Sequence, residues 1–490
     1  MGVSATPPKQ GLATASWVQS PRAFLAPLAL AQFICSFAGS NMNVMINDIS
    51  HDLNTDVNGV KTTITLFLVI MAVLMIPCSK LSDRWGRKRC LIGGLTLYGI
   101  GTVLSAVAPG LGVLILGNSV FQGVGTAFLI PPVYILTTMA FTSLQSRARA
   151  FGVISGMGGI GAAAGPLIGG VITSGISWRA AFVFQALVVV TIIVLARRVV
   201  DPVPPDPQRP FDAIGATLSA VGMFFLVFGI GKAGKNNTLL IISVAIGVAF
   251  LAGFFVFIRS RERAGKEPLL SLDLFKNRLS NLGLITQNLQ WLLLMGVSFV
   301  VSVFLQTERH YSAIKTGVIF TAATLGILAS SLAAERLAKK YLQKTLIAAG
   351  FVTTAAGIGL LLGLVHAASS SAWAFAPGLL LIGLGLGVML TPSVNLVQGA
   401  FPEEKQGEIS GLSRSISNLG SSFGTAIAGT ILVSNLASGN GTYVAAMIVL
   451  AVTALAGLLI AMRLPDNPLS MAAPGVSTPA AAPSPLDTAV

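Results

Sequence analysis

Long apolar runs constrain the fold of this chain more than any other feature of its sequence. About fourteen of them are long enough to cross a hydrocarbon core of about 30 Å as helices. Only 10% of the residues are charged, whereas soluble proteins contain about 25%. Because so few charges cannot cover a soluble surface, the bilayer must be part of the solvent, and we predict an all-α, multi-pass membrane protein. The expected spans are residues 23–48, 59–79, 90–108, 111–140, 149–174, 179–199, 213–231, 238–258, 281–306, 315–338, 345–366, 373–398, 408–436 and 441–462.

The basic residues are distributed unevenly between the two sides of these spans. If the N-terminus is cytoplasmic, 25 of the 31 Lys and Arg residues fall on the cytoplasmic side. The six on the outer side are Lys61, Arg179, Lys232, Lys235, Arg309 and Lys315. This asymmetry follows the positive-inside rule, which sets the orientation of membrane proteins. We therefore predict a protein of the cell (inner or plasma) membrane with both termini cytoplasmic. The net charge of +14 reflects this topology, and no nucleic-acid partner is expected.

Residues 79–89, between the second and third spans, form the densest charge cluster of the chain. An ordinary turn is one interpretation of it. Because apolar runs flank it on both sides, we instead predict a very short turn between two membrane-spanning helices. Asp83 is a lone carboxylate among several cations there, so we expect it to pair with them and with a helix end of the second half, and thereby to gate the cytoplasmic side. The residues assigned to this gating motif are Leu81, Asp83, Arg84, Gly86, Arg87 and Lys88.

A second motif lies in the fifth span. Gly161, Gly165 and Gly169 recur every four residues and so form one flat helix face, on which another helix can rest closely. A generic packing face is the plainer interpretation of such glycines. The full run, with Pro166 and Gly170, is more specific.

Both motifs carry a resemblance to a known family. The charge cluster resembles the pattern Gly-x-Leu-x-Asp-Arg-x-Gly-Arg-Lys of the major facilitator superfamily of secondary transporters, with Ser79 in place of the first glycine. The glycine run is similar to the fifth-helix motif of the antiporters of that superfamily. The two extra spans in the middle of the chain resemble the fourteen-helix drug:proton antiporters. The resemblance implies a major-facilitator-type fold with two six-helix bundles, two inserted helices and alternating access.

The expected organisation has five parts. They are a disordered cytoplasmic tail (1–22), an N-terminal six-helix bundle (23–199), a linker with two additional transmembrane helices (200–280), a C-terminal six-helix bundle (281–463) and a second disordered cytoplasmic tail (464–490).

Polar residues inside the spans are candidates for the lining of a cavity. Five of them share one face of the first span, because their spacings of three and four residues match the helical repeat. Such a stripe must face protein or water rather than lipid, so helix–helix hydrogen bonding and a cavity lining both remain open. The candidate lining residues are Gln32, Ser36, Ser40, Asn43, Asn118, Gln122, Gln287, Gln290 and Asn395, and the stripe in the first span ends at Asn47.

Proton coupling needs a group that titrates during the cycle. Ala38 and Ser119 occupy the positions where the drug-exporting relatives carry an acid and an arginine, and no acid is expected in mid-membrane. Asp48 is the only carboxylate continuous with the polar stripe. It is either an interfacial aspartate that ends the first span or the coupling group.

The chain contains no pattern for a metal cluster, a nucleophile–base pair or a phosphate loop, so neither an enzyme nor a cofactor is expected. We predict a monomeric secondary active transporter in the lipid bilayer that exports small organic compounds by antiport with protons. One alternative is a facilitator or importer of a neutral metabolite, which an uncharged cavity would favour. Another is a non-transporting receptor or scaffold, which would need an expanded loop or soluble domain for its partners.

Overall fold

The structure is a computed structural model, which describes residues 20–465 apart from 142–143, 202–203, 209, 231–235, 367–371, 403–404 and 434–439. The described residues form helices joined by short connections. The long helices are α1 (Pro21–Asn41), α3 (Val57–Trp85), α4 (Arg87–Ala106), α6 (Gly123–Ala140), α7 (Leu144–Gly175), α8 (Trp178–Ala196), α9 (Ala213–Ile230), α10 (Asn237–Arg263), α12 (Arg278–Val303), α13 (Ala313–Lys340), α14 (Gln343–His366), α15 (Ala376–Gln398), α16 (Gln406–Val433) and α17 (Asn440–Met462). The short elements are η1 (Met42–Val44), α2 (Ile46–Asp52), α5 (Leu111–Leu114), η2 (Ile115–Gln122), α11 (Asp273–Lys276), η3 (Phe304–Glu308) and η4 (Ala372–Phe375).

Thirteen helices of the described chain are long and apolar enough to span a membrane. The helix α16 is as long as its neighbours, with 28 residues, but it is rich in serine and too polar to count among the thirteen. It is nevertheless packed among α3, α6, α9, α12, α15 and α17, which bury its polar residues against protein. With α16 included, the described residues supply the fourteen spans that the apolar runs predict.

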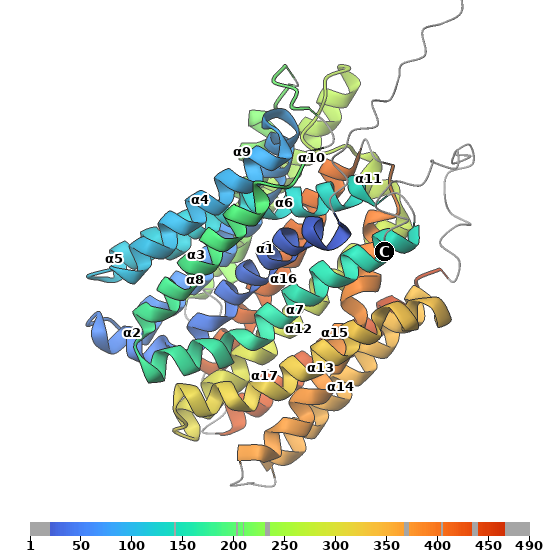
Figure 1. The fold of residues 1–490 in the computed structure, drawn as a ribbon. Helices are drawn as coiled ribbons and strands as arrows, with labels where there is room; N and C mark the ends of the chain where they lie inside the picture. Colours follow the sequence, from blue (N-terminus) through green and yellow to red (C-terminus); the bar gives the residue numbers. More distant parts are fainter. Residues whose placement is uncertain are drawn as a thin grey trace, which may run out of the picture.

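The helices form two bundles that lie side by side (Figure 1). The first bundle contains α1 to α8, drawn in blue to green, and the second contains α12 to α17, drawn in yellow to red. The pair α9 and α10 packs together, and α9 lies against both α3 and α16. The inserted pair therefore covers the junction between the two bundles rather than standing apart from it.

A single glycine joins α3 to α4 at the charge cluster. Gly86 has a φ of +95°, a conformation that side-chain-bearing residues rarely adopt, and it lets the chain reverse between Trp85 and Arg87 without a longer loop. Asp201 then accepts hydrogen bonds from the backbone N–H groups of Arg87 and Lys88, at 2.8 and 3.2 Å. These contacts fix the start of α4. We call this end of the molecule, which the charge distribution predicts to be cytoplasmic, the inner face, and the opposite end the outer face.

The first span differs from the single helix expected over residues 23–48. The helix α1 ends at Asn41, one 3-10 turn follows, and α2 begins at Ile46. Asn47 and Asp48 are exposed on α2. The polar stripe of α1 therefore does not continue along one helix to Asp48, because the chain leaves the α-helical path before it reaches Asn43.

Candidate functional site

A small cavity lies between the two bundles. Its volume is about 30 Å³, which is enough for a water molecule or two in this closed form. The helices that line it are α1, α3 and α6 of the first bundle and α12 and α16 of the second. The lining residues are Gln32, Cys35, Ser36, Gly39, Leu68, Met71, Met75, Thr126, Ile130, Trp291, Met295, Arg414, Ser417, Asn418 and Ser421.

Arg414 is the one charged side chain in this lining, and it is only 3% exposed. Its Nη1 donates a hydrogen bond to the hydroxyl of Tyr134 at 3.1 Å, and its guanidinium lies 4.3 Å from the centre of the Tyr134 ring. A charged side chain inside a membrane protein usually marks a functional site, because its burial is costly. The topological assignment had placed Arg414 with the cations of the cytoplasmic side, and the structure corrects this: it is a buried cation between the bundles.

A chain of hydrogen bonds runs through Arg414 from one bundle to the other. On the first-bundle side, the Tyr134 hydroxyl donates to Oε1 of Gln32 at 3.1 Å, and Gln32 Nε2 donates to Ser36 at 3.2 Å. On the second-bundle side, Arg414 Nη2 lies 3.5 Å from the Ser413 hydroxyl, which donates to Oε1 of Gln287 at 2.8 Å. A ligand that changed the position of Arg414 would thus act on both bundles.

The nine candidate lining residues are divided among several places. Gln32 and Ser36 line the cavity, and Gln287 joins it through the hydrogen-bond chain. Ser40 instead faces α7, and Gln290 donates to the carbonyl of Leu386 at 3.3 Å. The others are buried elsewhere and do not line this cavity: Asn43, Asn118, Gln122 and Asn395.

Sequence reasoning did not identify Arg414 or Tyr134 as site residues. A signal for Arg414 was present, because it falls within the expected span 408–436. It also lies on a helix whose polar residues recur at helical spacing; these are Ser410, Ser413, Ser417 and Ser421. Tyr134 lies in an apolar run, and no local pattern distinguishes it from a core tyrosine.

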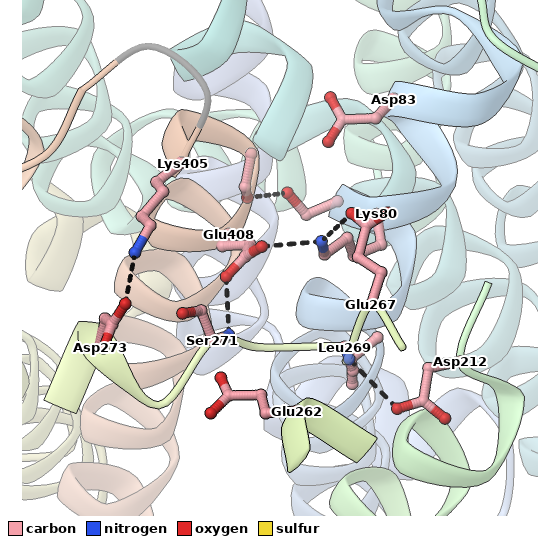
Figure 2. Close-up of polar contacts among 12 residues, drawn as sticks. Lys80, Asp83, Asp212, Glu262, Glu267, Leu269, Ser271, Asp273, Lys405 and Glu408 are labelled. Atoms are coloured by element: carbon pink, nitrogen blue, oxygen red, sulfur yellow. Dashed lines mark hydrogen bonds and ion pairs between the residues drawn. The ribbon is translucent and has the colours of Figure 1, made fainter. Parts of the chain in front are cut away.

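Ion pairs close the inner face below the cavity (Figure 2). Lys80 of α3 is 8% exposed and pairs with Glu408 of α16 at 2.8 Å and with Glu267 of the α10–α11 loop at 3.2 Å. Beside it, the hydroxyl of Ser79 donates to the carbonyl of Gly407 at 2.5 Å. One lysine of the first bundle thus binds the start of α16 and the loop that follows the inserted helices. We call these contacts the inner seam.

The α10–α11 loop is tied to the inner seam by its backbone. Glu408 accepts a hydrogen bond from the N–H of Ser271 at 2.7 Å, and Asp212 at the start of α9 accepts from Leu269 at 3.1 Å (Figure 2). The side chains of Leu269 and Leu270 are buried. Carboxylates from both the inserted pair and the second bundle therefore hold this loop across the junction.

The gating motif lies at the same seam. Asp83 accepts a hydrogen bond from Arg87 at 2.9 Å, and its carboxylate fills the space into which a side chain on Gly407 would project. The carboxylate thus lies next to the N-terminal turn of α16, where the helix dipole favours negative charge. Arg84 donates to the carbonyl of Pro207 at 3.0 Å, and Lys88 to that of Arg197 at 2.7 Å. Leu81 and Gly86 belong to the helix end and the turn that present these groups.

The glycine face of α7 packs against α1. A Cβ on Gly165 would lie 3.1 Å from the backbone nitrogen of Asn41 and 3.2 Å from Cβ of Ser40, and Gly169 and Gly161 face the same helix. The backbone of Pro166 instead approaches Gly317 of α13 in the second bundle, and Gly170 is buried. The helix α7 is therefore in close contact with both bundles.

Contacts between the bundles also close the outer face. Gln306 of η3 donates to the carbonyl of Asn43 at 3.2 Å, and Lys61 of α3 lies 5.7 Å from the centre of the Phe299 ring in α12. Within the first bundle, Asp52 at the exposed end of α2 pairs with Arg179 of α8, and this hydrogen bond, with a further one from Trp178, holds the pKa of its carboxyl below the usual value. The structure is therefore closed at both faces around the central cavity.

Two bundles enclose a central cavity, and separable contacts close it at each face. This is the architecture of an alternating-access transporter. The sequence profile of the Major Facilitator Superfamily matches residues 28–273 and 283–486. The chain belongs to this superfamily. Its members are transporters rather than enzymes, and the chain is a multi-pass membrane protein.

The curated relatives confirm the resemblance to drug exporters. The chain is 27% identical to the puromycin resistance protein pur8 of Streptomyces alboniger over 416 residues, which cover 83% of this chain and 81% of that one. It is 26% identical to the multidrug efflux pump LfrA of Mycolicibacterium smegmatis over 433 residues, covering 88% and 84%. Among solved structures, the human organic anion transporter MFSD10 matches with a TM-score of 0.61 at 14% identity, over 90% of this chain and all of that one. This last likeness confirms the predicted fold and carries no statement about substrate.

Proposed function

We propose that this protein exports small organic compounds across the cell membrane by alternating access, coupled to an inward flow of protons. The observation that carries the proposal is the closed cavity between two bundles, with separate contacts at its inner and outer faces. Opening one set of contacts while the other stays closed would expose the cavity to one side at a time. Relatives named for puromycin resistance and multidrug efflux support export as the direction.

The inner seam is the part that we assign to gating. It joins α3 and α16 through Lys80, Glu408, Ser79 and Gly407, so it must break for the cavity to open inward. Asp83 strengthens it from the first bundle by lying against the start of α16. These contacts hold the inner face closed in the state that is open to the outside.

Asp48 is our proposed coupling carboxylate. Although its side chain is exposed, nearby protein atoms partly desolvate the carboxyl and raise its pKa, an effect that outweighs a backbone hydrogen bond and the nearby His51. A raised pKa favours proton uptake from an acidic exterior. Export of a substrate in exchange for inward-moving protons requires such uptake. Asp48 lies on α2 at the outer face and outside the cavity lining, so the proton would bind at a site separate from the substrate.

The alternative of a facilitator for a neutral metabolite rested on an uncharged cavity. Arg414 in the cavity wall removes that support. The superfamily match likewise favours transport over a receptor or scaffold role.

Transport by the purified protein in liposomes tests the proposal. Puromycin, riboflavin and an impermeant organic sulfonate form a suitable panel, because together they cover a cation, a neutral compound and an anion. We expect movement of at least one compound to be accelerated by a pH gradient that is acidic on the side of the outer face. Export that is independent of the gradient would contradict proton coupling, and absence of transport for every compound, in protein shown to be folded, would contradict the function.

A further inference from the structure

Among the residues that the structure describes, the charge of Arg414 has no counter-ion in the closed cavity. Among the described residues, its hydrogen-bond partners are the hydroxyl groups of Tyr134 and Ser413, and no carboxylate lies within ion-pair distance. A guanidinium has five N–H groups to donate. The buried Nε–H of Arg414 has no hydrogen-bond partner among the described residues. Burial of a cation is costly unless an anion compensates it, so the site as it stands is electrostatically incomplete.

The cavity wall around Arg414 has a polar and an apolar part. Asn418, Ser417 and Gln32 contribute neutral polar groups to the same lining as Arg414. The rest of the lining is mainly apolar and includes Met71, Met75, Met295 and Trp291. Methionine side chains adapt to apolar bodies of different shapes, and an indole offers a flat surface for stacking.

We propose that the cavity binds organic anions, with a carboxylate, sulfonate or phosphate group on Arg414 and an apolar body against the methionines and Trp291. A guanidinium suits such groups because its planar fork can donate two parallel hydrogen bonds to them. The proposal rests on the proposed function and specifies its substrate class. It also gives the hydrogen-bond chain a role: a bound anion would neutralise Arg414, which is hydrogen-bonded toward both bundles, and so would act on both of them.

Binding to the purified protein tests this inference separately from transport. Naphthalene-2-sulfonate and naphthalene-2-sulfonamide are matched probes, since they share one ring system and only the first is charged at neutral pH. We expect calorimetric titration to show at least tenfold tighter binding of the sulfonate to the parent protein. Arg414→Gln should abolish that preference, and Arg414→Lys, which keeps the charge without the fork, should retain part of it. Arg463→Gln, an exposed arginine beyond the end of α17, is the control and should change nothing.

Thermal unfolding separates this role from a structural one. Because Arg414→Gln removes an uncompensated buried charge, the ligand-free variant should unfold at a temperature equal to or above that of the parent, whereas loss of a structural arginine would lower it. The sulfonate should raise the unfolding temperature of the parent and leave that of Arg414→Gln unchanged.

Four results would overturn the inference: equal affinity of the parent for both probes, no binding of either, an unchanged preference in Arg414→Gln, or sulfonate binding that chloride abolishes and gluconate does not. The last would assign the site to an inorganic anion. All four can occur in a protein that transports puromycin or riboflavin, so they leave the proposed function intact. Absence of transport with a preserved sulfonate preference would contradict the proposed function instead.

Discussion

Replacing Glu408 by glutamine should shift the protein toward states that are open at the inner face. The carboxylate of Glu408 is 11% exposed and pairs at 2.8 Å with Lys80, which is 8% exposed. The amide of glutamine has nearly the same shape, so the substitution removes charge with little change in packing. Asp83 and its contact with α16 stay in place.

The size of the effect follows from what the variant keeps. Breaking a buried ion pair costs about 3–5 kcal/mol when the other charge is left alone. Lys80 retains Glu267 at 3.2 Å. Lys80 and the N–H of Ser271 bind different oxygens of Glu408, so the single oxygen of glutamine can replace only one of these two hydrogen bonds. We therefore expect a loss of about 1–3 kcal/mol, which corresponds to a change of about 5- to 150-fold in the equilibrium between closed and open inner faces.

Electron-spin distance measurements between labels on the two bundles would report this shift. Arg89 and Leu342 are exposed positions at the inner ends of α4 and α14, so cysteines there can be labelled in a background without the three buried native cysteines. Glu408→Gln should add a population with a longer distance between the labels. Lys276→Gln is the matched control, because the Lys276–Asp273 pair is exposed and lies outside the contact between the bundles. A distance distribution identical to that of the parent in Glu408→Gln would refute our reading of the inner seam.

Three further predictions concern other parts of the molecule. Gly165→Leu should overpack the contact with α1, lower stability by about 1–3 kcal/mol and impair transport. Gly175→Leu on the same helix should have little effect on thermal unfolding, because a Cβ there would meet no atom within 4 Å beyond its own helix and chain neighbours, and equal unfolding temperatures for the two variants would refute the packing argument. Asp83→Asn should insert normally into membranes and transport slowly in liposomes, and a normal rate would exclude the carboxylate from gating. Asp48→Asn should flatten the dependence of transport on external pH, since a carboxyl with a raised pKa gains its proton at a higher pH than usual; Asp52→Asn is the control, and a profile that stays like that of the parent in Asp48→Asn would exclude Asp48 as the coupling group.

The fold could be predicted from the sequence because hydropathy and charge act over whole spans. The apolar runs locate each membrane helix, including α16, whose serines lower its hydropathy but whose length and position in the second half are retained. The break after Asn41 was not predictable from the same pattern. A helical repeat of polar residues in 23–48 continues across it, and only the structure shows that the chain turns through η1 before α2.

The site could be predicted only in part, because its decisive contacts join distant residues. Helical spacing correctly grouped Gln32, Ser36 and Ser40 on α1, but it could not tell that Ser40 would face α7 while the other two would face the cavity. Lys80 and Glu408 are 328 positions apart in the sequence, and neither lies in a pattern that names its partner. Arg414 was counted with the cytoplasmic cations because it lies only six residues after the start of the expected span 408–436.

A reversible cross-link between the two bundles tests alternating access most directly. A Cβ on Gly156 of α7 would lie 3.1 Å from Cβ of Ser331 of α13, close to the separation of about 3.5–4.5 Å in a disulfide. The double variant Gly156→Cys with Ser331→Cys, in the cysteine-free background, would be oxidised in liposomes and its transport of the best probe measured before and after reduction. We predict that oxidation stops transport and that reduction restores it, while each single variant transports under both conditions. Full transport with the disulfide formed would contradict the account, because the inner face could then not open by separation of the bundles.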